Sequence, residues 1–308
     1  MSLILHHYPQ SPVAHKVRLA LGIAGATWQS VEIPRIPPKP LLMPLTAGYR
    51  RTPVLQIGAD IYCDSQNIAR VLEEYGCPNS LFPDGVTGRS MMMVSWSENT
   101  LFDLAVRVVI TNALDTAPAE FIADRGALYF EKDWSPEALR ADLSGAMLRL
   151  QAGLAWVEFQ LVASEGVFLN GNTPCYADAA IGYIAWFLRG RWEGGAGFLA
   201  PYEQLCKLES ALADIGEGTS SDLSGEDALA VAKAAYPASP TGVSVPFTAG
   251  MKEGHKIAIQ PHGTNADPLV TGTLRYLDAT RVSIDHDTPE TGPVAVHFPI
   301  AGYDIRPL

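Results

Sequence analysis

The sequence predicts a multidomain α+β protein with an α/β domain, an all-α helical bundle domain and a small antiparallel β domain. Three observations predict this fold class. Strand-like and helix-like apolar patterns alternate in residues 1–84, only helical patterns follow in 89–216, and apolar residues alternate with period two after Pro237. A length of 308 residues with 47% apolar side chains provides enough material for two or three buried cores.

The first domain is expected to have the element order β-α-β, an irregular stretch, and then β-β-α. Ser11 is a favoured N-cap residue and Pro12 suits the first helical position, so a helix is expected to begin there. Five prolines within 34–44 exclude a regular helix from that stretch. The expected strands are 3–7, 27–33, 54–57 and 61–63, and the expected helices are 12–21 and one that begins at Asp64 or Ser65 and ends before Gly76.

The helical domain is expected at 89–216 and the β domain at 238–308, where it forms a barrel or a sandwich. Residues 81–88 and the Gly/Ser/Thr-rich residues 216–224 lack apolar periodicity and are expected to be linkers. A short helix is expected from Ser224, so 217–237 forms a linker with a short helix.

The charge balance excludes some partners. Lys and Arg total 22 and Asp and Glu total 33, a net charge of −11, which disfavours nucleic acid and anionic membranes because both need a basic face. The first 84 residues contain 7 basic and 6 acidic residues, so this domain is the part suited to an anionic small molecule. No apolar stretch approaches the ~18 residues of a membrane-spanning helix, and the first residues lack a secretory signal pattern. A cytoplasmic protein is therefore expected.

The four cysteines and seven histidines predict neither disulfides nor a metal site. No two cysteines form a C-x-x-C pair, which favours reduced thiols. Four histidines lie in the last 54 residues, but none has the close spacing of a metal-ligand pair. The segment Asp285-His286-Asp287 is expected to be a polar turn. A Ser-His-Asp hydrolase is disfavoured because the sequence lacks a G-x-S-x-G nucleophile elbow.

Three short segments carry groups suited to an anionic or peptide-like ligand. Ser11, at a helix N-terminus, places a hydroxyl beside free backbone N–H groups and the positive end of the helix dipole, which stabilises a thiolate. A cis bond at Thr52-Pro53 would expose the Thr52 N–H and C=O to the backbone of a ligand. Asp64-Ser65 begins a helix, where the N–H groups and the Ser65 hydroxyl suit a carboxylate and Asp64 suits an ammonium group. Helix capping alone also accounts for Ser11 and for Asp64-Ser65.

In this order, the three segments resemble the N-terminal domain of the glutathione transferase superfamily. The matching residues are a short strand, S-P-x-x-x-K-V-R-x-A-L from Ser11, Thr52-Pro53-Val54-Leu55, and D-S-x-x-I-A-x-x-L-E-E from Asp64. The helical domain adds Leu169-Asn170-Gly171 followed by Tyr176-Ala177-Asp178, which is similar to the family's element at the start of its central helix. The resemblance spans 1–216 and implies a thioredoxin-like first domain.

The resemblance also implies roles for these residues. Ser11 matches the position of the family's catalytic Ser or Cys, and a serine there disfavours thiol-exchange reductase chemistry because it forms no mixed disulfide. Thr52 and a cis-Pro53 match the backbone clamp on the cysteinyl part of glutathione. Asp64 and Ser65 match the pair that holds the γ-glutamyl group. Glutathione is thus the expected co-substrate, with no metal, and a homodimer is the expected assembly.

The implied reaction starts from a thiolate. A free thiol with a pKa of about 8.5 is only a few per cent ionised at neutral pH, so lowering the pKa by ~2 units, which corresponds to roughly 2.7 kcal/mol, makes the thiolate dominant. The thiolate then attacks a small apolar electrophile in a conjugation, isomerisation or dehalogenation, which implies a role in detoxification. The alternative is a non-catalytic glutathione-transferase-like scaffold whose C-terminal β domain binds a partner or ligand.

Two parts of the predicted site are assigned by position alone. For the apolar substrate pocket, with ordinary core packing as the alternative, the candidates are Tyr8, Val13, Phe102, Val106 and Trp186. The proline-rich stretch replaces the helix that in the family often contacts the glycyl end of glutathione. The candidates for its carboxylate are Arg35, Lys39, Arg50 and Arg51.

Overall fold

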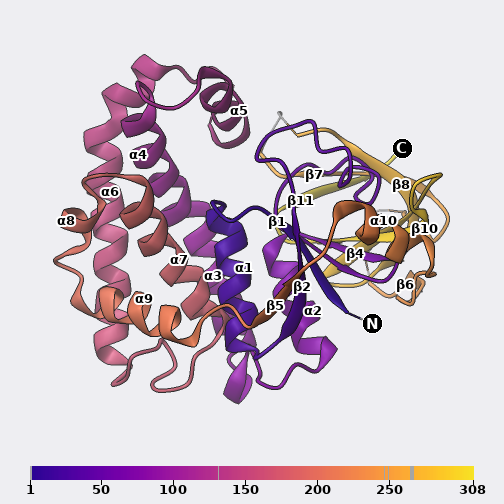
Figure 1. Ribbon diagram of the computed structural model, residues 1–308, viewed down its shortest axis with the longest axis horizontal. Coiled ribbons are helices and arrows are strands. Elements are labelled where there is room, and N and C mark those ends of the chain that lie inside the picture. Colours follow the sequence, from indigo (N-terminus) through magenta and orange to yellow (C-terminus); the bar gives the residue numbers. More distant parts are fainter. Residues whose placement is uncertain (1, 131, 246, 249, 264–266) are drawn as a thin grey trace. The chain divides into compact units, whose positions relative to one another are not determined.

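The computed structural model describes residues 2–130, 132–245, 247–248, 250–263 and 267–308 (Figure 1). The chain forms two compact units. The first contains 1–14, 27–71 and 219–308, and the second contains 15–26 and 72–218. Helices α1 (Pro12–Ile23) and α2 (Ser65–Tyr75) each contribute residues to both units.

The first unit contains the strands of the chain. Its N-terminal strands are β1 (Leu3–His7), β2 (Thr27–Glu32), β3 (Val54–Ile57) and β4 (Asp60–Cys63). Its later strands are β5 (Thr219–Asp222), β6 (Gly242–Val243), β7 (Lys256–Pro261), β8 (Val270–Leu277), β9 (Arg281–Thr288), β10 (Gly292–Pro299) and β11 (Tyr303–Pro307). Helix α10 (Gly225–Lys233) follows β5 and begins where the Ser224 hydroxyl accepts the Asp227 N–H. The predicted order β-α-β, irregular stretch, β-β-α is confirmed.

Within the described part of the chain, these strands form one sheet in the order β11-β7-β8-β9-β10-β4-β3-β1-β2-β5, with β6 beside β8. Strand β1 is parallel to β2 and antiparallel to β3, and β3 and β4 form a hairpin. The strands from β7 to β11 pair in antiparallel fashion, as predicted. Strand β10 then pairs in parallel with β4, so the C-terminal strands extend the N-terminal sheet.

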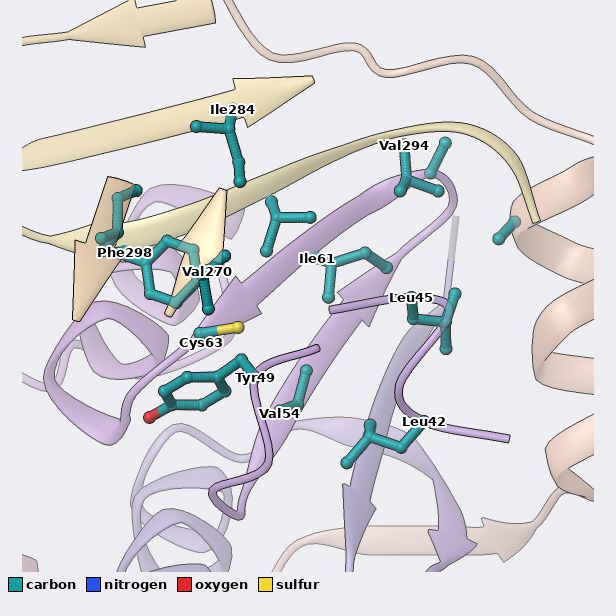
Figure 2. Packing of buried hydrophobic residues seen from close by; sticks show 14 of the residues in the cluster. Leu42, Leu45, Tyr49, Val54, Ile61, Cys63, Val270, Ile284, Val294 and Phe298 are labelled. Carbon is teal, nitrogen blue, oxygen red and sulfur yellow. The ribbon is translucent and has the colours of Figure 1, made fainter. Parts of the chain in front are cut away.

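One apolar core is shared by the N-terminal and the C-terminal strands. Alternate side chains of a strand point to the same face, and the inward faces of both sets of strands are buried together. Figure 2 shows side chains of this core, among them Val54, Ile61, Cys63, Val270, Ile284, Val294 and Phe298. Burying one such side chain stabilises the fold by roughly 1.5–3 kcal/mol. Because the two sets of strands bury these side chains against each other, each set depends on the other for stability.

The proline-rich stretch forms turns and no regular helix, as predicted. Local backbone hydrogen bonds hold it together, and include those from the Leu42 N–H to the Lys39 carbonyl at 3.1 Å and from the Leu45 N–H to the Leu42 carbonyl at 3.0 Å. Leu42 and Leu45 are fully buried in the shared core, which fixes the stretch against the sheet (Figure 2).

Two segments differ from the expectations. Residues 219–222, expected within a linker, form β5, which pairs in parallel with β2. All four of its residues are polar and exposed, so no apolar alternation marks this strand. The expectation of a turn at Asp285-His286-Asp287 was wrong, because these residues lie in β9 opposite β10. A strand with one face toward water accommodates such charged residues.

The second unit is helical throughout its described part. Its elements are η1 (Pro83–Gly85), α3 (Thr87–Trp96), η2 (Ser97–Phe102), α4 (Asp103–Ala113), α5 (Ala119–Tyr129), α6 (Pro136–Ala163), α7 (Tyr176–Arg191), α8 (Gly195–Leu199) and α9 (Glu203–Ile215). Helix α7 is buried along most of its length. The Asp178 carboxylate fixes its start by accepting the N–H groups of Leu169 at 2.7 Å and Cys175 at 2.8 Å. Among the described residues, no helix combines the length and apolarity needed to span a bilayer.

Candidate functional site

The strand register brings the three predicted segments to one edge of the sheet. Because β3 is antiparallel to both β1 and β4, the end of β1, the start of β3 and the end of β4 share that edge. Ser11 follows β1, Thr52 precedes β3 and Asp64 follows β4. All three residues belong to the first unit. Segments that are up to 53 positions apart in the sequence therefore lie at one edge of the sheet.

Ser11 is the N-cap residue of α1. Its Oγ accepts the Ala14 N–H at 3.2 Å, and its own N–H donates to the Tyr8 carbonyl at 3.1 Å. The expected capping role is thus present. The cap uses the oxygen only as an acceptor, so the hydroxyl hydrogen can be donated to a ligand at the positive end of the helix.

Lys39 places a buried ammonium group beside Thr52. Its Nζ donates to Thr52 Oγ1 and to the Arg50 carbonyl, both at 2.9 Å, and the residue is 4% exposed. The peptide bond between Thr52 and Pro53 is cis. The positive charge of Lys39 therefore lies next to the Thr52-Pro53 segment.

Asp64 and Ser65 form the start of α2. Asp64 has a φ of +74°, in the left-handed region that Asp tolerates better than most residues. Its Oδ1 accepts the Gln66 N–H at 2.9 Å, and its carbonyl accepts the Ile68 N–H at 3.0 Å. Ser65 is the first helical residue and is buried. A carboxylate and a helix N-terminus thus lie side by side.

Two tyrosines that the sequence analysis missed reach Asp64. The Tyr303 hydroxyl donates to Asp64 Oδ2 at 3.1 Å, although the two residues are 239 positions apart. The Tyr49 hydroxyl lies 2.9 Å from the Tyr303 hydroxyl. Burial, with a further contribution from the Asp64 charge, raises the pKa of both tyrosines well above the usual value, so both phenols stay protonated. No local motif could have indicated a contact of such sequence separation.

An ion pair holds Arg51, the residue before Thr52. Its Nε and one terminal nitrogen donate to Asp267 Oδ2 at 2.9 Å and 2.6 Å. Burial alone would lower the pKa of Arg51, but the hydrogen bond and charge of Asp267 raise it above its usual value. Asp267 precedes β8, so the C-terminal region supplies a second contact to this edge.

The residues assigned to a substrate pocket are buried or half-buried within their units. Tyr8 and Val13 belong to the first unit, and Phe102, Val106 and Trp186 belong to the second. The Phe102 ring is surrounded by the rings of Tyr129, Tyr183 and Phe187. Trp186 stacks on His15 with ring centroids 4.1 Å apart. Their assignment to a pocket stays a prediction.

A Ser-His-Asp chain lies elsewhere in the sheet. Ser283 Oγ is 2.6 Å from His297 Nδ1, and His297 Nε2 is 3.0 Å from Asp60 Oδ1. Ser283 is fully buried, and the residues His297 and Asp60 are 1% and 4% exposed. Burial lowers the pKa of His297, which implies a neutral ring that donates from Nε2 to Asp60 and accepts from Ser283. We conclude that this chain ties β4, β9 and β10 together.

A second buried histidine predicts a loss of stability in acid. His6 Nε2 lies 2.8 Å from Gln56 Oε1, and its Nδ1 has no hydrogen-bond partner among the described residues. Burial lowers the pKa of His6 from 6.5 to about 4, against the smaller opposite effect of Gln56. Between pH 6.5 and about pH 4, His6 therefore binds a proton in the unfolded chain but not in the folded chain. The free energy of unfolding therefore falls as pH decreases from 6.5 to about 4, by about 3 kcal/mol from His6.

The measurement is urea unfolding of the wild type and His6→Gln at several pH values. As the pH falls from 7 to 4, the free energy of unfolding of the variant should rise by about 3 kcal/mol relative to that of the wild type. The comparison is needed because burial raises the pKa of Asp178 to about 6, and protonation of that carboxyl in the folded state opposes the His6 effect. A difference between the two proteins that stays constant with pH would contradict the prediction.

Comparisons with known proteins show which family this chain resembles. A family model described as the N-terminal domain of glutathione S-transferase matches residues 5–76. The crystal structure of a GST-like protein from Pseudomonas syringae is 33% identical, with 100% of this chain and 99% of that chain covered and a TM-score of 0.76. No curated protein gives a match.

Two more distant solved structures share the fold. A Tau class glutathione S-transferase from mango, Mangifera indica, is 17% identical, with 71% of this chain and 94% of that chain covered and a TM-score of 0.53. A glutathione S-transferase from Methylobacillus flagellatus with GSH bound is 18% identical, with 70% and 99% covered and a TM-score of 0.51. The Pseudomonas syringae protein thus matches over the whole chain, whereas these two match about 70% of it.

Proposed function

Because the chain belongs to the glutathione S-transferase superfamily, we propose that it is an enzyme that uses the glutathione thiolate on a small apolar electrophile. The observation that carries the proposal is the convergence of Ser11, Thr52 and Asp64 on one edge of the sheet. This edge offers a hydroxyl, the N-termini of two helices and a carboxylate.

Ser11 is proposed to stabilise the thiolate of bound glutathione. Its hydroxyl donates to the sulfur at the start of α1, where the helix dipole also favours a negative charge. A hydrogen bond to a charged group contributes roughly 1.5–3 kcal/mol, which is sufficient to lower a thiol pKa by one to two units. The proton of the thiol passes to solvent. The thiolate then forms a carbon–sulfur bond, and in a conjugation that displaces a substituent the leaving group departs with its electron pair.

Different residues at the same edge are proposed to bind the γ-glutamyl, cysteinyl and glycyl parts of glutathione. Asp64 and Ser65 hold the ammonium and carboxylate of the γ-glutamyl group, and the backbone of Thr52 next to Pro53 holds the cysteinyl part. Of the four basic candidates for the glycyl carboxylate, we choose Lys39, because its ammonium lies on Thr52 Oγ1 while Arg51 is engaged by Asp267. A charge-assisted hydrogen bond from an ammonium suits that carboxylate.

Further properties are proposed from the family relationship. They are a conjugation, isomerisation or dehalogenation reaction, a role in detoxification, a homodimeric assembly and a cytoplasmic location.

The alternative is a non-catalytic scaffold whose C-terminal β domain binds a partner. This function needs residues 238–308 to act as a separate module. The core shared by the C-terminal and N-terminal strands does not favour such independence, because a fragment would expose the apolar faces in Figure 2. We therefore keep the enzyme as the conclusion.

The test is turnover of a panel of small electrophiles, with and without glutathione. Consumption of at least one electrophile that requires glutathione and produces a thioether or a glutathione-dependent rearrangement is expected. Glutathione binding without turnover of any electrophile would instead support the scaffold.

A further inference from the structure

We propose that Tyr303 is a positioning residue for Asp64, and that the C-terminal strands thereby complete the site for the γ-glutamyl ammonium group. This inference rests on the proposed function and goes beyond it, because it assigns a part of the ligand site to a region that the family's two-domain pattern lacks. Its basis is the hydrogen bond from the Tyr303 hydroxyl to Asp64 Oδ2 at 3.1 Å.

The topology explains how a residue near the C-terminus reaches this edge. Strand β10 runs parallel to β4, so both strands end at the same edge of the sheet. The chain then turns through 300–302, where the Tyr303 N–H donates to the Ile300 carbonyl at 3.2 Å, and returns as β11. Tyr303, the first residue of β11, therefore lies beside Asp64, the first residue after β4.

The orientation of the Tyr303 ring is fixed by its neighbours. Its centroid lies 5.7 Å from that of Phe298, which in turn lies 5.4 Å from that of Tyr49 in an edge-to-face arrangement. The single phenolic proton of Tyr303 goes to Asp64, so Tyr49 is the donor in the contact between the two hydroxyls at 2.9 Å. The resulting chain runs from Tyr49 through Tyr303 to Asp64.

This chain sets the direction of the Asp64 carboxylate. One oxygen accepts the Gln66 N–H at 2.9 Å and the other accepts the Tyr303 hydroxyl, so rotation of the carboxylate would break these hydrogen bonds. A carboxylate offers about four acceptor positions, so both contacts are compatible with a bound ammonium group. Holding the carboxylate before the ligand arrives reduces the entropy lost on binding.

A second contact from the C-terminal region supports the same assignment. Asp267 binds Arg51, whose side chain is 27% exposed, and is itself 2% exposed in its side chain. Arg51 directly precedes Thr52 in the sequence. Tyr303 of β11 and Asp267, which precedes β8, therefore hold two side chains of the segments that carry the site.

The experiment compares two probes on four proteins by isothermal titration. The probes are glutathione and N-acetylglutathione, which lacks the ammonium charge. The proteins are the wild type, Asp64→Asn, Tyr303→Phe and Tyr276→Phe. The last is a matched control, because Tyr276 also donates its hydroxyl to an aspartate oxygen, Asp278 Oδ2, at 3.1 Å.

We expect the wild type to bind glutathione more tightly than the acetylated probe. Tyr303→Phe should weaken glutathione binding about three- to tenfold and leave the acetylated probe within about twofold, because only the contact to the ammonium depends on the direction of Asp64. Tyr276→Phe should change neither value. Asp64→Asn should remove most of the discrimination between the probes.

Each of the following results would overturn the inference. An equal loss for both probes in Tyr303→Phe would show a structural role, and an unchanged glutathione affinity would show no role. If Asp64→Asn weakens glutathione binding while Tyr303→Phe does not, the positioning role fails and the proposed function stands. If the wild type does not bind glutathione, the proposed function fails and this inference fails with it.

Discussion

Phe298→Ala is expected to lower the free energy of unfolding of the first unit by about 3–5 kcal/mol. Phe298 is fully buried near the end of β10, and its ring contacts that of Tyr49, which follows the proline-rich stretch (Figure 2). The Phe298 ring also contacts that of Tyr303 from β11. Truncation removes the apolar area of the ring and leaves a cavity at the junction of the N-terminal and C-terminal strands. Urea unfolding followed by circular dichroism measures the change.

Phe247→Ala is the matched control for Phe298→Ala. Phe247 is 86% exposed, so its removal should change the free energy of unfolding by no more than about 0.5 kcal/mol. A loss below about 1 kcal/mol in Phe298→Ala would contradict a core shared by the two sets of strands, because such a loss is typical of surface sites.

Ser11→Ala is expected to lower kcat/KM for the glutathione-dependent reaction about 10- to 100-fold. The substitution removes the hydroxyl that donates to the thiolate, a hydrogen bond to a charged group that contributes roughly 1.5–3 kcal/mol. The pKa of the bound thiol, followed by ultraviolet absorbance of the thiolate, should rise in parallel. Ser11→Thr keeps a hydroxyl and should retain more activity than Ser11→Ala.

Loss of the helix cap must be separated from loss of the hydroxyl donor. Ser135 caps α6 with the same geometry, since its Oγ accepts the Ala138 N–H at 3.1 Å as Ser11 accepts that of Ala14 at 3.2 Å. Both alanine variants should lose about 1 kcal/mol of stability, but only Ser11→Ala should lose turnover. Unchanged turnover and thiol pKa in Ser11→Ala would show that Ser11 is a cap and nothing more.

Local signals in the sequence predicted the elements around the site. Ser11-Pro12 marked the start of α1, the prolines of 34–44 marked a stretch of turns, and Asp64-Ser65 marked the start of α2. These predictions succeeded because capping residues and prolines act on their own backbone. The domain boundaries at 84, 89, 216 and 238 stay predictions.

Contacts between distant segments could not be predicted in the same way. The pairing of β10 with β4 and the hydrogen bond from Tyr303 to Asp64 depend on the fold of the whole first unit, which apolar periodicity does not encode. The polar strand β5 was missed because an exposed edge strand needs no apolar alternation. The buried Ser283-His297-Asp60 chain likewise joins three strands and has no local motif.

Isothermal titration of the wild type, Ser65→Ala and Ser224→Ala with glutathione tests the central claim most directly. Ser224 is the matched control, because it also stands at a helix start in the first unit, where it accepts the Asp227 N–H at 3.0 Å. We predict saturable binding to the wild type, an increase in Kd of about tenfold or more in Ser65→Ala through loss of a charged hydrogen bond, and no change in Ser224→Ala. Absence of binding at millimolar glutathione, or equal affinity in all three proteins, would contradict the assignment of this edge as a glutathione site.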